Sequence, residues 1–163
     1  MKKISIGVIG GGSWGTALSL LLVRNGYEID LWVYEKSLLK ILNDKYENEF
    51  FLPNFKLPKA IHPSSSLEQT VSNKDIIFLV TPTHTIRKIV QQFAPFLKND
   101  CLVINASKGI EIDTLLTIDK VLESILPKYC LRGCISGPTF AQEIAQNLPS
   151  AIVAAARDHK ITK

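Results

Sequence analysis

The 163-residue chain lacks the sequence features of several protein classes. No apolar run approaches the roughly 18 residues that a membrane span requires. Met1-Lys2-Lys3 leads directly into an apolar segment, without the separate hydrophobic region and cleavage site of a signal peptide. The net charge is only +4 and the lysines are dispersed, which argues against the clustered basic surface of a nucleic-acid-binding protein. We therefore expect a cytoplasmic protein without a membrane span or a nucleic-acid partner.

Cysteine is also scarce, with three residues in the chain. Cys130 and Cys134 form a C-x3-C pair, but no second Cys/His pair follows at the spacing of a zinc site, and Cys101 stands alone. This pattern favours reduced, partly buried thiols over a disulfide or a metal centre. We therefore predict no metal site.

The clearest pattern lies near the start of the chain, where an apolar segment runs into glycines. Residues 4–9 predict a buried parallel strand, and Gly10, Gly12 and Gly15 then give the G-x-G-x-x-G spacing of a dinucleotide-binding turn. Apolar residues at helical spacing follow in 17–22. This context favours a dinucleotide site over the alternative, a purely structural turn of another α/β protein.

Each of these glycines has a mechanical role in such a turn. Gly10 allows the backbone to turn sharply out of the strand, and Gly12 has no Cβ to block the approach of a pyrophosphate. Gly15 allows the helix to pack closely on the strand. The N–H groups of the first helical turn, together with the helix dipole, would then face a negatively charged ligand.

Strands and helices are predicted to alternate along the rest of the chain. Further strands are expected at 28–33, 76–80, 102–104, up to residue 135, and at 151–156. Helices are expected at 38–42, after a capping box that begins at Ser66, and at 86–90, 115–126 and 140–146. The proline-rich segment 50–58 is expected to be an irregular loop. This order predicts an α/β fold with a Rossmann-like, doubly wound, mainly parallel sheet, and residues 1–163 are expected to form a single dinucleotide-binding domain.

The unusual loops of this pattern each follow a predicted strand. They comprise residues 10–15, 34–35, 81–84, 105–109 and 136–139. The carboxyl ends of parallel strands lie at one edge of a sheet, where ligands of such folds bind. We therefore expect these loops to form one site.

Lys108 and Glu35 are the charged side chains of most interest in these loops. Lys108 lies between a serine and a glycine, so it can approach a phosphate or a polarised oxygen, or it is a surface lysine in a turn. Glu35 stands twenty positions after Gly15, where such folds place a carboxylate for the adenosine ribose. A solvated charge is the alternative interpretation of Glu35.

Three further side chains have two interpretations each. Thr139 is suited to donate a hydrogen bond to a substrate oxygen and to cap its helix, and these two interpretations are compatible. Trp14 either packs on a cofactor or supports the glycine turn. His84 fits a helix start better than an acid or base, because no carboxylate partner is evident in the sequence.

Four segments together resemble a known family: "IGGGSWGTAL", "NEFFLPNFKLP", "SKGIE" and "SGPTFAQEIAQNLPSAIV". They look like the amino-terminal domain of NAD(P)-dependent glycerol-3-phosphate dehydrogenase, in the correct order along the whole chain. The resemblance implies a cytoplasmic enzyme that interconverts dihydroxyacetone phosphate and sn-glycerol 3-phosphate for phospholipid synthesis. The hydride would pass between substrate C2 and the nicotinamide ring.

The resemblance also implies site residues, position by position. Besides the glycines of the turn, the cofactor-contacting positions of the family match Ser13, Trp14, Tyr34, Lys108 and Ala141. The substrate-contacting positions match Lys108, Gly137 and Thr139. Lys108 would then hold the polar end of a phosphorylated substrate beside the nicotinamide.

The sequence departs from the family pattern at the position of the second nucleotide-binding loop. Bacterial members often have arginine or histidine where Tyr34 stands, a cation suited to the 2′-phosphate of NADP. Tyr34 carries no such charge, and Glu35 would repel that phosphate. Either NAD or NADP is compatible with the resemblance, and these residues favour NAD.

The second departure is one of length. Family members continue into a helical domain that supplies the general acid/base lysine, so we expect no catalytic acid or base in this chain and negligible turnover by the chain alone. The alternative function is a non-catalytic dinucleotide-binding module left by truncation. A homodimer is compatible with a full-length enzyme, although these residues do not determine the oligomeric state.

Overall fold

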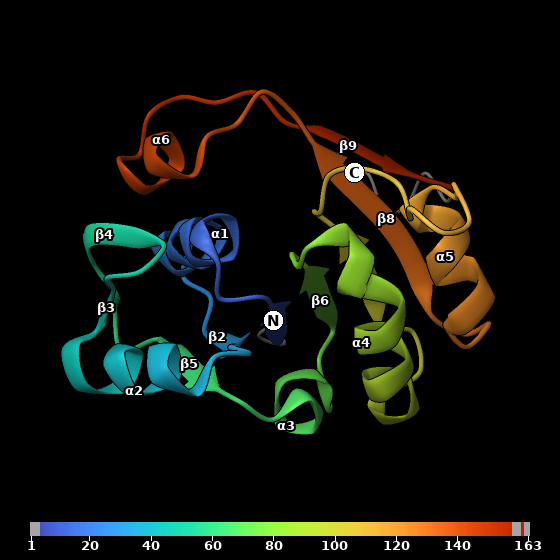
Figure 1. Cartoon of the computed structure of the whole chain (residues 1–163), viewed down its shortest axis with the longest axis horizontal. Helices are drawn as coiled ribbons and strands as arrows, with labels where there is room; N and C mark the ends of the chain where they lie inside the picture. The colour runs from blue at the N-terminus through green and yellow to red at the C-terminus, as the bar shows by residue number, and fades with distance from the viewer. Residues whose placement is uncertain (1–3, 158–160, 162–163) are drawn as a thin grey trace.

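The computed structural model describes residues 4–157 and 161 and has a seven-stranded β-sheet at its centre (Figure 1). The strand order is β5-β2-β1-β6-β7-β8-β9. The strands are β1 (Ile6–Ile9), β2 (Ile29–Trp32), β5 (Ile61–Ser64), β6 (Ile76–Leu79), β7 (Leu102–Asn105), β8 (Leu131–Ser136) and β9 (Val153–Ala156). Neighbours from β5 to β8 pair in parallel, whereas β9 runs antiparallel to β8. The predicted Rossmann-like, mainly parallel α/β fold is confirmed.

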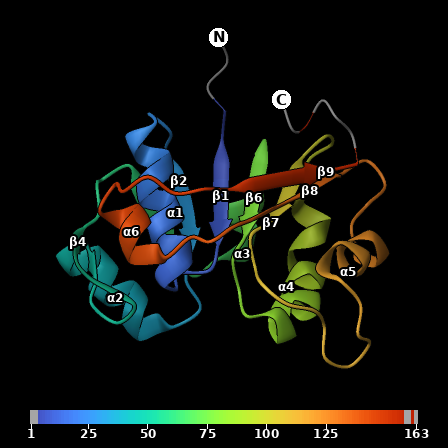
Figure 2. The ribbon, with the colours of Figure 1, turned by 90° about the horizontal axis from the view of Figure 1, so that it is seen from above.

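Helices cover both faces of the sheet. They are α1 (Ser13–Arg24), α2 (Lys36–Lys45), α3 (Leu67–Val71), α4 (Ile86–Phe93), α5 (Ile118–Ile125) and α6 (Ala141–Ala145), with 3-10 turns η1 (Thr83–Thr85) and η2 (Ala94–Phe96). Figures 1 and 2 show α1 beside α6, with α4 and α5 on the other side of the sheet. The single domain expected for residues 1–163 stays a prediction, and Met1-Lys2-Lys3 lie outside the described residues.

Two hydrophobic cores lie on the two faces of the sheet, because side chains alternate along each strand. On β1, Val8 belongs to the core under α1, α2 and α6, and Ile9 belongs to the core under α3, α4 and α5. Both side chains are fully buried. The continuous apolar strands of the sequence therefore correspond to strands that are covered on both faces, as expected for a parallel sheet.

The structure differs from the sequence-based expectations in three places. The expected irregular loop at 50–58 belongs to an antiparallel hairpin of β3 (Glu47–Asn48) and β4 (Leu52–Lys56), anchored by the buried Leu52. Strand β5 was not predicted, because His62-Pro63 breaks its apolar pattern. Helix α5 begins at Ile118 rather than near 115, since Leu115 has a φ of 55° and cannot continue a helix.

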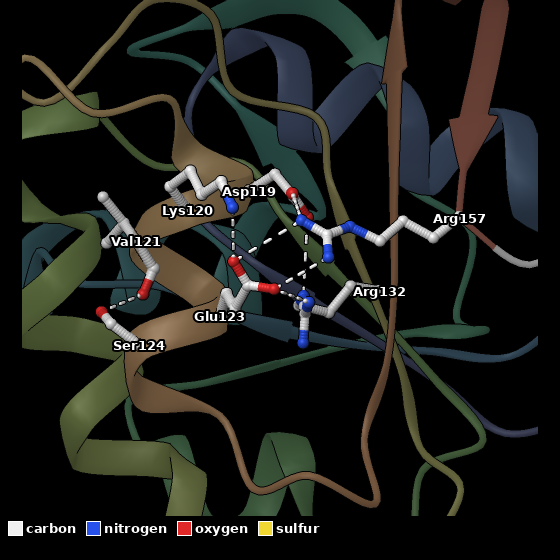
Figure 3. A network of polar contacts seen from close by, with 7 residues as sticks. All are labelled: Asp119, Lys120, Val121, Glu123, Ser124, Arg132 and Arg157. Atoms are coloured by element: carbon white, nitrogen blue, oxygen red, sulfur yellow. Dashed lines mark hydrogen bonds and ion pairs between the residues drawn. The ribbon is translucent and has the colours of Figure 1, made fainter.

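A group of ion pairs joins α5 to the far edge of the sheet (Figure 3). Glu123 on α5 pairs with Arg132 on β8 at 3.2 Å and with Arg157, just after β9, at 2.9 Å. Asp119 also pairs with both arginines. These groups are partly exposed, so each pair adds little stability by itself, but together they tie the end of β9 to α5.

The Arg87–Glu111 pair predicts a loss of stability in acid. The Arg87 guanidinium donates to both carboxylate oxygens at 2.8 and 2.7 Å, and the Thr114 hydroxyl donates as well. These contacts lower the pKa of Glu111 from 4.5 to about 2. A carboxylate with a lowered pKa in the folded state stabilises the fold above its unfolded pKa, and this contribution disappears as the pH falls toward 2.

We therefore expect the Tm to fall between about pH 5 and pH 2, with a smaller fall in the Glu111→Gln variant. Thermal melts followed by circular dichroism across this range would measure the effect. Asp113→Asn, an exposed position in the same loop, is the matched control and should keep the wild-type profile. Equal pH profiles for wild type and Glu111→Gln would contradict the assignment.

Candidate functional site

A cleft of about 390 Å³ opens where several strands end. It is lined by Gly12, Ser13, Trp14, Val80, Thr81, Pro82, Ala106, Ser107, Lys108, Thr139, Phe140 and Ala141. These residues follow β1, β6, β7 and β8, so the expected convergence of the strand-end loops is confirmed for these four strands. Its size is in the range of small-molecule and cofactor sites.

The glycine turn shows the close packing that its spacing predicts. Gly10 has a φ of +128°, a conformation that favours glycine, and a Cβ there would lie 2.4 Å from the carbonyl oxygen of Val80. A Cβ on Gly15 would lie 1.9 Å from the carbonyl oxygen of Gly10. These two glycines therefore hold α1 tightly against the ends of β1 and β6.

Gly12 differs from these two glycines because it lines the cleft. A Cβ on Gly12 would meet no heavy atom of the described residues within 4 Å. Gly12 occupies the N-cap position of α1, and no side chain there caps the helix. The start of this twelve-residue helix is thus accessible from the cleft, which is the geometry of an anion site at a helix N-terminus.

Lys108 lies on a loop that is held by hydrogen bonds within the loop and to the segment that follows β6. Asn105 Oδ1 accepts from the N–H of Ser107 at 3.1 Å, and Ser107 Oγ donates to the carbonyl oxygen of Thr81 at 2.8 Å. Thr83 Oγ1 donates to the carbonyl oxygen of Lys108 at 2.5 Å. The Lys108 side chain is exposed, and among the described residues that line the cleft it alone carries a charge. The loop therefore presents one cation to the cleft from a fixed backbone.

The segment after β8 closes another side of the cleft. Thr139 is 8% exposed, and its N–H donates to the carbonyl oxygen of Gly137 at 2.9 Å. A Cβ on Gly137 would lie 2.3 Å from the carbonyl oxygen of Ala151, so this turn requires glycine. Helix α6 begins at Ala141 with Phe140 at its cap position, so Thr139 is not the capping residue. The capping interpretation of Thr139 is therefore wrong, and its contact with a ligand stays a prediction.

Gly137 also lines a smaller adjoining cavity, together with Trp14, Lys108 and Thr139. Trp14 takes part in the lining of both spaces and packs partly against the core under α1. Trp14 therefore contacts both the core and the cleft, and the two interpretations of Trp14 stay compatible predictions.

Tyr34, Glu35 and His84 are not among the residues that line the two cavities. Tyr34 is 77% exposed, with its ring centroid 6.0 Å from that of Trp32. Glu35 is exposed at the cap position of α2. His84 lies in η1 directly before α4, which agrees with a role at a helix start.

Thr81 is a lining residue that sequence reasoning did not single out by itself. It is 6% exposed, and its Oγ1 has no hydrogen-bond partner among the described residues. A buried hydroxyl without a partner is costly, and a ligand group in the cleft could satisfy it. The available signal was its position directly after a strand, within the loop 81–84.

The residues present fit a dinucleotide by three observations. The helix start is accessible at Gly12, Lys108 adds a cation to the lining of the same cleft, and the lining residue Thr81 has a buried hydroxyl without a partner among the described residues. No group of three or more His, Cys, Asp or Glu side chains arranged to hold a metal occurs among the residues that the structure describes. In the same part of the chain, none of the helices is sufficiently long and apolar to cross a membrane.

The three cysteines are free thiols, as expected. Cys101 and Cys130 are buried. Burial raises the pKa of Cys101 to about 12 and that of Cys130 to about 11, so both stay protonated and unreactive at neutral pH.

Comparison with known proteins agrees with this geometry. A protein from Geobacter metallireducens named glycerol-3-phosphate dehydrogenase (NAD(P)+) is 43% identical over 158 residues, which cover 94% of this chain and 46% of that protein. A protein of the same name from Syntrophotalea carbinolica is 40% identical, over 98% of this chain and 49% of that protein. The chain thus spans about half the length of these curated relatives.

A solved structure is also similar over almost the whole of this chain. The crystal structure of glycerol-3-phosphate dehydrogenase from Coxiella burnetii matches with a TM-score of 0.92 and 28% identity, over 98% of this chain and 49% of that one. The family model for the N-terminus of NAD-dependent glycerol-3-phosphate dehydrogenase matches residues 5–162. Both the fold and the glycine-lined cleft lie within this match, and the chain belongs to the family of NAD-dependent glycerol-3-phosphate dehydrogenase N-terminal domains.

Proposed function

We propose that this chain is the dinucleotide-binding half of an enzyme that interconverts dihydroxyacetone phosphate and sn-glycerol 3-phosphate, a reaction that feeds phospholipid synthesis. The observation that carries the proposal is the position of Gly12 at the accessible start of α1, in a cleft that also contains Lys108. The names of the curated relatives support glycerol 3-phosphate as the substrate and NAD(P)+ as the cofactor.

The cofactor would be held mainly by the glycine turn. Its pyrophosphate would lie against Gly12 and Ser13, where the N–H groups and dipole of α1 favour negative charge. Trp14 and Ala141, which line the same cleft, would contact its remaining groups. Tyr34, which is exposed after β2, would lie toward its adenosine end, as the family resemblance implies. Gly10 and Gly15 serve this site by setting the shape of the turn. The bound cofactor supplies hydride transfer.

The substrate would lie in the main cleft beside Lys108 and Thr139, with Gly137 in the small adjoining cavity that these two residues also line. The Lys108 ammonium would hold a substrate oxygen by charge, and the Thr139 hydroxyl would donate to or accept from the same molecule. Because the loop around Lys108 is fixed by hydrogen bonds, its contribution is orientation. Proton transfer is expected from a residue of the second half of the enzyme.

A preference for NAD over NADP belongs to this proposal. Tyr34 and Glu35 are both exposed after β2, and neither provides a positive charge for a 2′-phosphate. A carboxylate at this place would repel that phosphate and accept hydrogen bonds from ribose hydroxyls.

Titration calorimetry of the chain with NADH and NADPH tests both the proposed dinucleotide binding and the preference for NAD. We expect NADH to bind, and to bind more tightly than NADPH. Tighter binding of NADPH would overturn the cofactor preference alone. Absence of binding for both would overturn the proposed function.

A cytoplasmic location is part of the same proposal, and the free thiols Cys101, Cys130 and Cys134 support it. A homodimer of the full-length enzyme stays a prediction.

A further inference from the structure

Asn48 connects the hairpin of β3 and β4 to the glycine turn, although it lies 37 positions away from Gly11 in the sequence. Its side chain is fully buried. Nδ2 donates to the carbonyl oxygen of Gly11 and to Thr16 Oγ1, both at 2.8 Å, and Oδ1 accepts from the N–H of Phe51 at 3.0 Å. Because Gly11 O can only accept and Phe51 N–H can only donate, these partners fix which end of the amide is which.

The bond to Gly11 determines how the next peptide group is oriented. All described peptide bonds are trans, so the carbonyl of Gly11 and the N–H of Gly12 lie in one plane and point in opposite directions. Asn48 holds the Gly11 carbonyl on the buried side, where Thr16 Oγ1 also approaches it at 3.4 Å. The N–H of Gly12 therefore points away from Asn48, and Gly12 is a residue that lines the cleft.

An anchor of this kind matters because Gly10, Gly11 and Gly12 follow one another. Consecutive glycines have the largest conformational freedom of any residues, and a peptide group between two of them can rotate at little steric cost. The three glycines have no side chains that select one orientation of this peptide group. Thr16 Oγ1 of α1 reaches the Gly11 carbonyl at 3.4 Å, and the Asn48 amide reaches it at the shorter distance of 2.8 Å. A buried amide from another part of the fold can select the orientation.

We propose that Asn48 is a positioning residue that directs the N–H of Gly12 toward the pyrophosphate of the dinucleotide. This inference rests on the proposed function. It also gives the hairpin a role: β3 carries Asn48, and the buried Leu52 and Leu57 fix the hairpin to the core under α1 and α2.

The experiment compares ligands with and without a pyrophosphate. ADP contains the group that the Gly12 N–H would bind, and adenosine lacks it. Binding of both is measured by calorimetry for wild type, Asn48→Ala and Thr16→Val. Thr16→Val is the matched control, because it removes a hydroxyl from the same buried network, together with the longer 3.4 Å contact of that hydroxyl to the Gly11 carbonyl, and leaves the 2.8 Å Asn48–Gly11 bond in place.

We expect Asn48→Ala to weaken ADP binding by at least about tenfold and adenosine binding by less than about threefold, since one hydrogen bond to a charged group is lost. Thr16→Val should lower the Tm and leave the ratio of the two affinities within about threefold of wild type. An equal loss for ADP and adenosine in Asn48→Ala would overturn the inference, because it would show a role in folding alone.

A measurement on the unmodified protein keeps the test independent of how the variants fold. The amide resonance of Gly12 in a nitrogen-15 correlation spectrum should shift on addition of ADP and stay in place with adenosine. A Gly12 resonance that does not respond to ADP, in a protein that binds ADP, would overturn the inference and leave the proposed function standing. Failure of the wild type to bind ADP, NADH or NADPH would instead overturn the proposed function.

Discussion

Gly12→Val is expected to weaken NADH binding by at least about a hundredfold while the protein stays folded. The backbone of Gly12 has a φ of −72° and a ψ of −175°, which valine adopts without strain. Its Cβ would meet no described heavy atom within 4 Å, so the packing around it is kept. The added side chain would stand where a pyrophosphate must approach the first turn of α1.

Calorimetry measures the affinity of the variant for NADH, and thermal melts of the same samples measure its stability. Replacing glycine at a helix N-cap by an apolar residue costs about 1 kcal/mol, so the Tm should fall by only a few degrees. Unchanged affinity in a folded Gly12→Val variant would remove the glycine turn from the binding site.

Gly15→Ala is expected to cause a large loss of stability, in contrast to Gly12→Val. The new Cβ would lie 1.9 Å from the carbonyl oxygen of Gly10, far inside the contact distance, and a backbone atom cannot rotate away. Helix α1 would have to move off β1. We expect a loss of about 3 kcal/mol or more in the free energy of unfolding, which corresponds to a fall of roughly 6 to 12 °C in Tm.

The sign of this change separates two explanations for Gly15. Helix propensity alone predicts that alanine inside a helix stabilises the protein by about 1 kcal/mol relative to glycine. Tertiary packing predicts destabilisation. Denaturant unfolding of wild type, Gly15→Ala and Gly12→Ala decides between them, with Gly12→Ala as the control that lacks the clash. A Gly15→Ala variant as stable as wild type would contradict the close packing described above.

The sheet could be predicted from the sequence because its central strands are continuous apolar runs followed by breakers. The strand β1, the turn at Gly10–Gly15 and the start of α1 are adjacent in the chain, so their signals are local. The convergence of four strand-end loops followed from parallel pairing alone. Lys108, which follows β7, lies in the cleft as its place after a strand predicts.

Other elements gave weaker signals because they depend on partners that are distant in the chain. Strand β5 contains His62-Pro63 and is recognisable mainly by its pairing with β2. The hairpin of β3 and β4 has a proline at position 53 and asparagines at 48 and 54, so its composition resembles a loop. Its stability comes from burial of Leu52 and from the hydrogen bonds of Asn48.

Periodicity and spacing are local properties of the chain, and they were sufficient to predict the fold class, the glycine turn and the four strand-end loops that line the cleft. The contacts behind these glycine roles are visible only in the folded protein. A Cβ on Gly10 or Gly15 would lie against a backbone oxygen, whereas Gly12 lines the cleft. The folded protein also shows that Asn48, which belongs to no motif of the turn, holds the peptide group of Gly11. A buried amide can select the orientation of a distant glycine only after folding has brought the two together, and no local pattern records that contact.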